Sequence, residues 1–594
     1  MKISKLILLA CVWGSIVSCE DLLDPKLTNE WSSETVWTNP DMAQAVLTQV
    51  YADLMVVPDH YDDNFLDAAT DNALTRNYGS SVYRASMGAF SRSTNPLGNW
   101  DNMYDKIQSI NLFMEKGVTD DVIYNRVSKE TDQAIKTRLL GEAYFLRAWC
   151  SFKLLQTYGG RTDEGEALGY TITNHFIGDK ESAKPSLFKR NSYKDCVSQI
   201  VSDCEEAARR LPVTYTGDDV VVGKSKIGRA CGLAANALKA RTLLYAASPL
   251  FNEKPIESGN ELIGYASYDR ERWKIAADAA RNFINTYGTG DGAIMGLDDN
   301  FKNVFTNWYS NEHKEVIFFR ENAMDKTVET ANGPLGLSGA KQGNGRTNPT
   351  QNLVDAFLMK DGHFINDKGK YEYNEQLPYA QRDPRLEYTI IHNGSSWVNS
   401  TMETWQGGAN NPLGSSYSLT SYYMRKFMGD FEAANEYQDT QHNWVMFRYA
   451  EILLNFAEAE NEYLSTPSQA VYDAIIALRR RAGIEPGEKN LYGLTTNEQT
   501  HNLTQAEMRK VIQNERRIEL AFEEHRYWDI RRWRLAEQVY AQPIQGMYIT
   551  KSQTSTTYVP QAVLNVQWDN KRYFYPIPYS EVIKNKNMVQ NPNW

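Results

Sequence analysis

Residue patterns that build common enzyme and metal sites are scarce in this chain. Its 594 residues include eight His and six Cys, with no HExxH, HxH or CxxC spacing, so neither a zinc site nor a disulfide framework is supported. No GK[ST] closes a glycine-rich turn and no GxSxG elbow is present. We therefore expect no metal and no cofactor, whereas paired carboxylates for glycoside hydrolysis stay open at this point, because that chemistry requires only a separation in space. We expect four internal cysteines to be small buried hydrophobes: Cys150, Cys196, Cys204 and Cys231.

An excess of positive charge is also missing. The 63 Lys and Arg are outnumbered by 74 Asp and Glu, and the net charge of −11 argues against a nucleic-acid partner. A hydrophobic share of 42% excludes a disordered chain, and the mean hydropathy of −0.54 excludes a polytopic membrane protein. The 35 Tyr and 14 Trp outnumber 21 Phe, and rings with a polar tip suit half-exposed surfaces, which is a first indication of a binding function.

The N-terminus has the pattern of an export signal. Lys2 and Lys5 precede the apolar stretch 6–17, and the small residue Ser18 stands directly before Cys19. A cysteine directly after the small residue resembles the lipobox of bacterial lipoproteins, in which the thiol is diacylated. The acidic EDLLD that follows resembles the surface-export tag of Bacteroidota lipoproteins.

This pattern predicts a lipoprotein signal peptide at 1–18 and a mature chain of 19–594 that a palmitate-type anchor at Cys19 holds on the outer membrane, facing outward. Cys11 is a second candidate, but the apolar stretch before it is too short. An ordinary secretory signal with an incidental cysteine is the other alternative.

Amphipathic segments with helical spacing dominate the mature chain. They lie at 41–55, 100–115, 131–158, 192–211, 229–247, 272–287, 447–463, 468–482 and 504–537. Three successive pairs resemble tetratricopeptide-like helix hairpins, with an Ala-rich first helix and a second helix that ends at Pro or Gly. We predict a mainly α fold: a tetratricopeptide-like helical-hairpin scaffold at about 40–287 and 441–540, broken by insertions.

Two irregular stretches interrupt this scaffold. The larger, about 288–440, is dense in Gly, Asn, Pro, Trp and Tyr and contains the strand-like runs EVIFFR and LEYTII; the smaller is 59–99. Loops of this length are usually functional. We therefore expect 288–440 to be a loop-rich ligand-binding region with short strands, and 541–594 to be a C-terminal tail.

The last long segment carries many charges. Thr504 and Glu507 form a capping box at its start, and Glu515 and Glu519 share a stripe with apolar residues. Catalysis is one interpretation of these carboxylates. A structural lattice of ion pairs is the one we favour, because arginines stand nearby: Arg479, Arg480, Arg481, Arg516, Arg517 and Arg526.

These motifs together resemble the SusD/RagB family of outer-membrane nutrient-binding lipoproteins. The resemblance rests on Cys19 with its acidic follower, and on RYAEILLNFAEAEN with ALRRRAG, NERRIELAFEEHRYWDIRRW and YPIPYSEVIKNKNMVQNPNW. Weaker matches are WDNMYDKIQSIN, LRAWCSFKLLQTYGG, NPTQNLVDAFLMKDG and QRDPRL. They cover essentially the whole mature chain, which departs from the family by ending in NPNW.

The resemblance implies a non-enzymatic, cell-surface glycan-binding lipoprotein of polysaccharide utilization. Such a protein captures an oligosaccharide or polysaccharide and delivers it, as a hinged lid, to a SusC-like TonB-dependent transporter. Peptide uptake of the RagB type is the alternative within the family. A secreted hydrolase is a third hypothesis, which no residue pattern favours.

Glycan recognition needs flat rings for the C–H faces of sugars and planar polar groups for their hydroxyls. The resemblance places such platforms in the two irregular stretches. The candidates there are Asp71, Asn72, Arg76, Tyr78 and Tyr83, then Trp308, Tyr309, Trp397, Trp405, Tyr422 and Tyr423. For each aromatic side chain, ordinary packing is the alternative.

Overall fold

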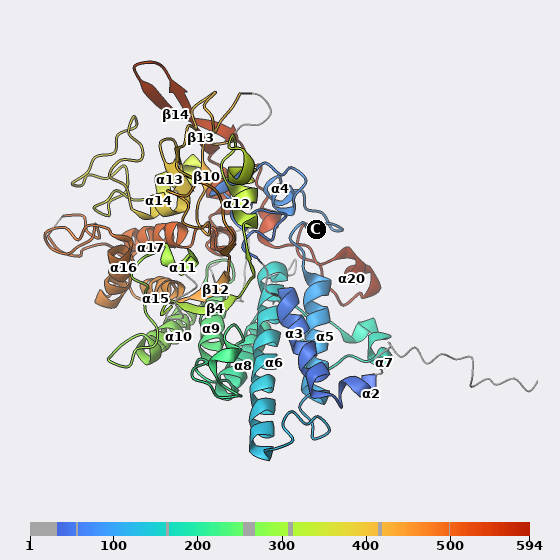
Figure 1. Cartoon of the computed structure of the whole chain (residues 1–594). Coiled ribbons are helices and arrows are strands. Elements are labelled where there is room, and N and C mark those ends of the chain that lie inside the picture. The colour runs from blue at the N-terminus through green and yellow to red at the C-terminus, as the bar shows by residue number, and fades with distance from the viewer. Residues whose placement is uncertain are drawn as a thin grey trace, which may run out of the picture.

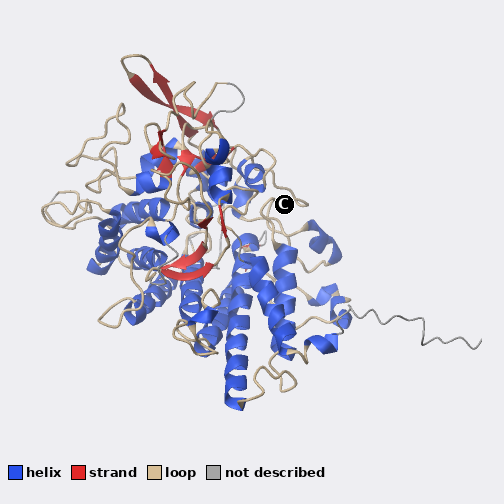
Figure 2. Ribbon diagram, viewed as in Figure 1, coloured by secondary structure: helices blue, strands red, loops and turns tan. Residues whose placement is uncertain are grey.

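The computed structural model describes residues 33–54, 57–161, 166–252, 268–306, 313–413, 418–497 and 499–594. Long helices gather on one side of the molecule, and short helices, two-stranded sheets and loops form the other side (Figures 1 and 2). The predicted mainly α fold is confirmed. Cys19, Trp308 and Tyr309 lie outside the described residues, so the expectations for these three stay predictions.

The long helices begin and end within three residues of the ranges expected from hydrophobic periodicity, with one exception. They are α3 (Pro40–Leu54), α5 (Trp100–Lys116), α6 (Lys129–Tyr158), α8 (Tyr193–Arg210), α9 (Gly232–Ala247), α10 (Glu271–Tyr287), α15 (Tyr449–Tyr463), α16 (Gln469–Ala482) and α17 (Gln505–Glu519). Side-chain caps start several of them: Ser128 accepts from the Thr131 N–H at 3.1 Å, and the capping box of Thr504 and Glu507 is confirmed.

The exception is the segment 504–537, where the prediction of one continuous helix is wrong. After α17 the chain turns through Phe522 and Glu524, both left-handed with φ of 63° and 64°, before α18 (His525–Arg532) and α19 (Ala536–Tyr540). Buried partners hold this break: the Phe522 N–H donates to Asp67 Oδ1 at 3.0 Å, and Lys426 Nζ donates to two carbonyl groups of the turn. These contacts come from distant parts of the sequence, so helical periodicity did not reveal them.

The three expected helix pairs pack as hairpins: α6 with α8, α9 with α10, and α15 with α16. Small side chains permit the close approach, because α9 buries Ala234, Ala237 and Ala240 on its inner faces. Helix α10 also packs on α15, although the whole 288–440 region separates them in sequence. The scaffold is therefore continuous, and the irregular region is an insertion between two of its neighbouring helices (Figure 1).

The loop-rich side is built from short elements. Its strands pair antiparallel in twos: β1 (Ala73–Thr75) with β6 (Thr347–Pro349), β4 (Val316–Arg320) with β12 (Trp444–Arg448), β7 (Ile390–Ile391) with β10 (Tyr423–Met424), β8 (Ser396–Trp397) with β9 (Ser400–Thr401), and β13 (Ile544–Lys551) with β14 (Thr556–Leu564). Its short helices include α4 (Ser81–Ser86), α12 (Thr327–Asn332), α13 (Gln351–Ala356) and α14 (Arg385–Thr389). EVIFFR forms β4 as expected, whereas LEYTII begins as α14 and only its end is a strand.

A buried lattice of ion pairs joins this region to the scaffold, as we expected for the charged helix. Glu519 lies 2.7 Å from Arg448 Nη1 and 2.9 Å from Arg385 Nη1, and it also pairs with Arg481. Glu515 lies 2.6 Å from Arg385 and 3.0 Å from Arg479. Because both carboxylates are completely buried and satisfied by guanidinium groups, they serve the fold.

The four internal cysteines are buried and free, as predicted. Within the described ranges, no helix is both long and apolar enough to span a bilayer. The same ranges contain no cluster of His, Cys, Asp and Glu side chains arranged to hold a metal ion.

Candidate functional site

The structure brings the two irregular stretches together. Strand β1 of the first pairs with β6 of the second, and beyond them the Arg76 N–H donates to the Arg346 carbonyl at 3.0 Å. Arg76 Nη1 also donates to the Asn344 carbonyl at 3.3 Å. We call the surface formed by Arg76, Tyr78, Tyr83, Asn344 and Arg346 the junction surface.

Two tyrosines stand on this surface at the start of α4. Tyr78 is 59% exposed, and its ring meets the Tyr83 ring edge to face with centroids 5.1 Å apart. Ser80 fixes the turn between them, since its hydroxyl accepts from the Tyr83 N–H at 3.2 Å. The turn thus presents the Tyr78 side chain to solvent, two residues after Arg76.

Asp71 and Asn72 lie beneath the junction surface rather than on it. Arg526 binds both carboxylate oxygens of Asp71 at 2.8 Å, and Arg517 Nη2 lies 2.8 Å from the same group. Asn72 is completely buried, donating to Asp67 and accepting from Arg517 at 2.8 Å each. These two candidates therefore tie the loop to α17 and α18.

Asp71→Asn is expected to reduce stability in a pH-dependent way. Burial raises the pKa of the Asp71 carboxyl, but Arg517 and Arg526 outweigh it and hold the pKa at about 2. Because the pKa of Asp71 is depressed in the folded protein, its carboxylate stabilises the fold above about pH 4, and this stabilisation is lost as pH falls toward 2. The variant should lose about 2 kcal/mol of unfolding free energy at pH 7 in urea titrations, and less at pH 3. An equal loss of unfolding free energy at pH 7 and pH 3 would show that the ion pairs with Arg517 and Arg526 do not depress the pKa of Asp71.

Three aromatic candidates of the second stretch are buried. Trp397, Tyr422 and Tyr423 are fully enclosed, and each polar tip has an internal partner. Trp397 Nε1 donates to Tyr437 Oη at 2.9 Å, Tyr422 Oη donates to Gln351 at 2.5 Å, and Tyr423 Oη donates to the Asn410 carbonyl. No ring face of these three is open to a ligand in this structure.

Trp405 remains half-buried, at the edge of the loop that packs against β13. Lys551 Nζ lies 5.3 Å from the Trp405 ring centroid, within cation–π range. Glycine makes this loop packing possible: Gly336 has a φ of +78°, and a Cβ there would lie 1.7 Å from the Ala409 carbonyl oxygen. Of the described candidates, those with an accessible side chain are Arg76, Tyr78, Tyr83 and Trp405.

The sequence did not indicate a groove of about 750 Å³ on the same side of the molecule. Tyr388 and Arg425 form part of its lining, and Arg425 Cζ lies 5.8 Å from the Tyr388 ring centroid. Further lining groups are the polar side chains of Glu387, Ser395, Ser396, Asn399, Ser400, Thr401 and Glu432. We call this the Tyr388 groove. The groove thus combines one aromatic side chain with hydroxyl, carboxylate and guanidinium groups, a mixture typical of ligand sites.

A strained turn shapes one wall of the Tyr388 groove. The two-residue loop between β8 and β9 has positive φ at Val398 (44°) and Asn399 (52°), as a type I′ hairpin requires, although valine is disfavoured there. Backbone bonds hold the turn, because the Val398 and Asn399 N–H groups donate to the carbonyls of Phe431 and Glu432 at 2.8 and 3.0 Å. Trp397 and Val398 are buried, whereas Ser396, Asn399 and Ser400 of the same hairpin line the groove.

One signal in the sequence could have revealed Tyr388. Asp383 and Pro384 precede it, and this dipeptide marks a helix start. In the structure Asp383 Oδ1 accepts from the Arg385 N–H at 2.9 Å and begins α14. Helical spacing then puts Tyr388 one turn after Pro384, and both line the groove.

Comparison with known proteins is decisive for the family. A sequence model described as SusD family matches residues 314–594, and one described as starch-binding, associating with outer membrane, matches residues 23–242. The chain belongs to the SusD/RagB family. The family resemblance expected from the Arg- and Glu-rich motifs is thereby confirmed.

Individual relatives of this SusD/RagB member are distant in sequence. A SusD-like protein of Formosa agariphila is 23% identical over 567 residues, which cover 90% of each chain. A second SusD-like protein of that organism is 34% identical over 159 residues, so the match spans about a quarter of its length, 27%.

Solved structures share the fold. A SusD-like carbohydrate-binding protein from Bacteroides fragilis has a TM-score of 0.69 at 24% identity, over 93% of this chain and 100% of that one. A laminarin-binding SusD-like protein has a TM-score of 0.60 at 17% identity, over 94% and 100% of the two chains. These similarities establish a common SusD-like architecture.

Proposed function

We propose that this protein is a cell-surface glycan-binding lipoprotein that captures an oligosaccharide or polysaccharide and delivers it to a SusC-like TonB-dependent transporter. The observation that carries the proposal is the exposed Tyr78 ring on the junction surface, two residues after Arg76, whose contacts join the two loop stretches. A shallow aromatic platform suits a polymer that must slide or detach, whereas an enclosed pocket suits a single small molecule.

The chemistry of the junction surface fits sugars. The Tyr78 face can stack on the C–H face of a pyranose ring, and Tyr83 supports it edge to face. The guanidinium of Arg76 and that of Arg346, which lies 3.9 Å from Asp63, can donate to ring hydroxyls. The printed names of two structural relatives, a carbohydrate-binding and a laminarin-binding protein, support the same ligand class.

The N-terminal sequence supports the proposed attachment to the outer membrane. Cys19 would bear the acyl anchor and hold the mature chain on the outer membrane. The family description, associating with outer membrane, supports this location. Binding without cleavage is proposed because the buried carboxylates Glu515 and Glu519 are held in ion pairs.

The test is native gel electrophoresis of the purified full chain through gels containing single polysaccharides. At least one polysaccharide is expected to retard the protein, while a reducing-end assay of the same mixture stays at background. Calorimetry with peptides runs alongside. Peptide binding with no glycan retardation would replace the proposal by peptide uptake of the RagB type, and release of reducing ends would replace it by a hydrolase.

A further inference from the structure

Two short segments that are far apart in the sequence lie side by side on the outside of the helical scaffold. The first contains α7 (Asp179–Ser182) and the 3₁₀ turn Pro185–Leu187 that follows it. The second contains α20 (Tyr579–Lys584) and the residues directly after it. The side-chain amides of Asn585 and Asn587 donate to backbone carbonyls of the first segment at 2.5 and 2.8 Å, which fixes the two segments together.

Exposed lysines and exposed apolar side chains share the surface of these segments, which we call the basic edge. Its members are the lysines Lys180, Lys184, Lys189, Lys584 and Lys586 and the apolar residues Leu187, Tyr579, Ile583 and Val589. Leu187 is 61% exposed and Ile583 62%, and Tyr579 stands one helical turn before Ile583 on the same face of α20. Exposed apolar side chains that polar groups surround mark a surface for interaction with a protein or a membrane.

The charge of the basic edge is opposite to that of the whole chain. Residues 179–190 and 579–589 include six Lys and Arg against three Asp and Glu, whereas the chain carries a net charge of −11. Lys584 lies 3.3 Å from Glu581, and the other four lysines of the basic edge form no ion pair within the described ranges. A local excess of positive charge therefore faces solvent here.

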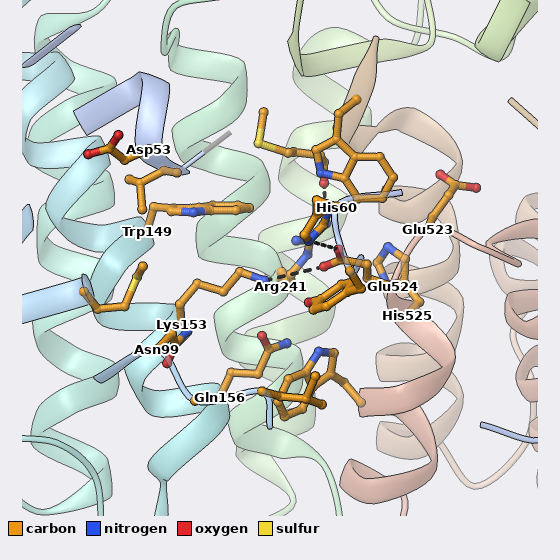
Figure 3. Close-up of a pocket in the computed structure, with 18 of the residues that line it drawn as sticks. Asp53, His60, Asn99, Trp149, Lys153, Gln156, Arg241, Glu523, Glu524 and His525 are labelled. Atoms are coloured by element: carbon orange, nitrogen blue, oxygen red, sulfur yellow. Dashed lines mark hydrogen bonds and ion pairs between the residues drawn. The ribbon is translucent and has the colours of Figure 1, made fainter. Parts of the chain in front are cut away.

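Cations inside the scaffold are paired instead. In the pocket of about 280 Å³ among the long helices, Figure 3 shows His60 and Lys153 directed at Glu524, whose carboxylate oxygens lie 3.0 and 3.8 Å away. Arg241 also lines this pocket, and it pairs with Glu451 at 2.6 Å. The interior charges thus neutralise one another, whereas the counter-charge of the basic edge must come from outside the chain.

The described chain begins at the same end of the scaffold. Helix α2 (Ser33–Val36) leads into α3, which runs opposite to α5 in Figure 1, and Lys106 of α5 contacts Asp53 at the end of α3. The start of α3 therefore lies beside the end of α5, where the Glu115 carboxylate accepts from the Phe176 N–H at 2.8 Å, just before α7. Figure 1 accordingly shows α2, α7 and α20 on one side of the molecule.

An anionic lipid surface matches this combination. Peripheral membrane binding has two parts: lysines attracted by lipid phosphates, and apolar side chains that enter the headgroup layer. The proposed acyl anchor at Cys19 stands 14 residues before Ser33, so it can hold the described body within about 50 Å of the membrane. Lysine is depleted in protein–protein interfaces, which favours a lipid surface over a protein partner.

We propose that the basic edge rests on the phosphate-bearing surface of the membrane, as a second contact beside the acyl anchor. Leu187 and Ile583 enter the headgroup layer, and the lysines pair with lipid phosphates. Helix α14, which carries Tyr388, and the β13–β14 hairpin lie on the opposite side of the molecule from α7 and α20 in Figure 1, so this contact turns the loop-rich side away from the membrane. The inference rests on the membrane attachment in the proposed function and not on its ligand.

Sedimentation with lipid vesicles tests the proposal on a chain without its first 19 residues, which lacks the acyl anchor and keeps every described residue. The protein is expected to sediment with vesicles of phosphatidylglycerol and phosphatidylethanolamine, but not with vesicles of phosphatidylcholine. Raising the ionic strength from about 0.05 to about 0.5 M should release it. Absence of binding to the anionic vesicles, or equal binding to both kinds of vesicle, would overturn the proposal.

Charge reversals locate the contact. Lys184→Glu combined with Lys586→Glu is expected to weaken vesicle binding at least about tenfold, because both lysines are exposed. The matched control, Lys368→Glu combined with Lys489→Glu, makes the same change of net charge at exposed loop positions outside the basic edge and should weaken binding less than about twofold. Equal weakening in the two double variants would show that net charge alone attracts the protein and would overturn the assignment.

The apolar part has its own variant. Ile583→Ser is expected to weaken vesicle binding with no change in Tm, because the side chain is exposed; Leu187→Ser replaces it if the Tm falls. If the charge-reversed protein binds anionic vesicles as the parent does but no longer co-purifies with the transporter from membranes, the basic edge is a protein interface and the proposal is wrong. Polysaccharide retardation of the same variants reports on the proposed glycan binding separately.

Discussion

Glu519→Gln is expected to lower the free energy of unfolding by about 3–5 kcal/mol, because it leaves buried guanidinium groups without their counter-charge. Glu519 pairs with Arg385, Arg448 and Arg481, and all four side chains are almost completely buried. Burial by itself raises the pKa of Glu519, but the three arginines outweigh it and keep it well below its usual range. The substitution keeps the size of the side chain, so a cavity does not contribute.

Urea denaturation followed by circular dichroism measures this loss. The matched control is Glu581→Gln, which removes an exposed glutamate 3.3 Å from Lys584 and should cost less than about 1 kcal/mol. A loss of similar size in both variants would show that the lattice contributes no more than a surface pair. Because the pKa of Glu519 is depressed in the folded protein, its stabilising contribution declines as pH falls below the usual range of a glutamate, so Glu519→Gln should cost less stability at pH 3 than at pH 7.

Tyr78→Ala is expected to weaken polysaccharide binding at least about tenfold, since truncating an aromatic anchor typically costs 1.4–2 kcal/mol or more. The ring is exposed and touches Tyr83, so the Tm should change little. Affinity gels with the polysaccharide that retards the parent protein measure the effect.

The Tyr388 groove provides the comparison for that measurement. Tyr388→Ala removes the aromatic face that lies 5.8 Å from the Arg425 guanidinium but leaves the junction surface intact. If Tyr388→Ala abolishes retardation and Tyr78→Ala does not, the ligand lies in the groove and our placement on the junction surface is wrong. Loss of retardation in both variants would contradict the idea that the junction surface alone binds the polysaccharide.

Helical periodicity identified the scaffold well because its signal is local. Eight helices kept their predicted bounds, since each buries one face at a spacing that the sequence displays. The break after Glu519 was missed because Lys426, nearly a hundred residues away, holds the turn carbonyls. A contact at that sequence distance leaves no periodic trace.

The candidate site was predictable only in part, for a related reason. Tyr78 stands between Asn77 and Gly79 and is exposed, as expected of an aromatic residue in a loop. Trp397 and Tyr423 stand on two-residue strands, and Tyr422 directly precedes one; in such strands a shift by one position exchanges inside for outside. Residue type alone does not tell which way such a side chain faces. Aromatic residues of the same kinds are therefore exposed at Tyr78 and buried at Trp397, Tyr422 and Tyr423.

The ion-pair lattice has a consequence for transplanting ligand specificity between members of the family. Because α10 packs on α15 across the insertion, the loop region has the geometry of a replaceable cassette. Three buried charges of this region nevertheless pair with scaffold residues: Arg385 with Glu515 and Glu519, Glu315 with Arg448 and Arg481, and Lys426 with Glu523. A chimaera that exchanges the cassette must carry this arginine, this glutamate and this lysine with it, or the recipient scaffold will be left with unpaired charges in its interior.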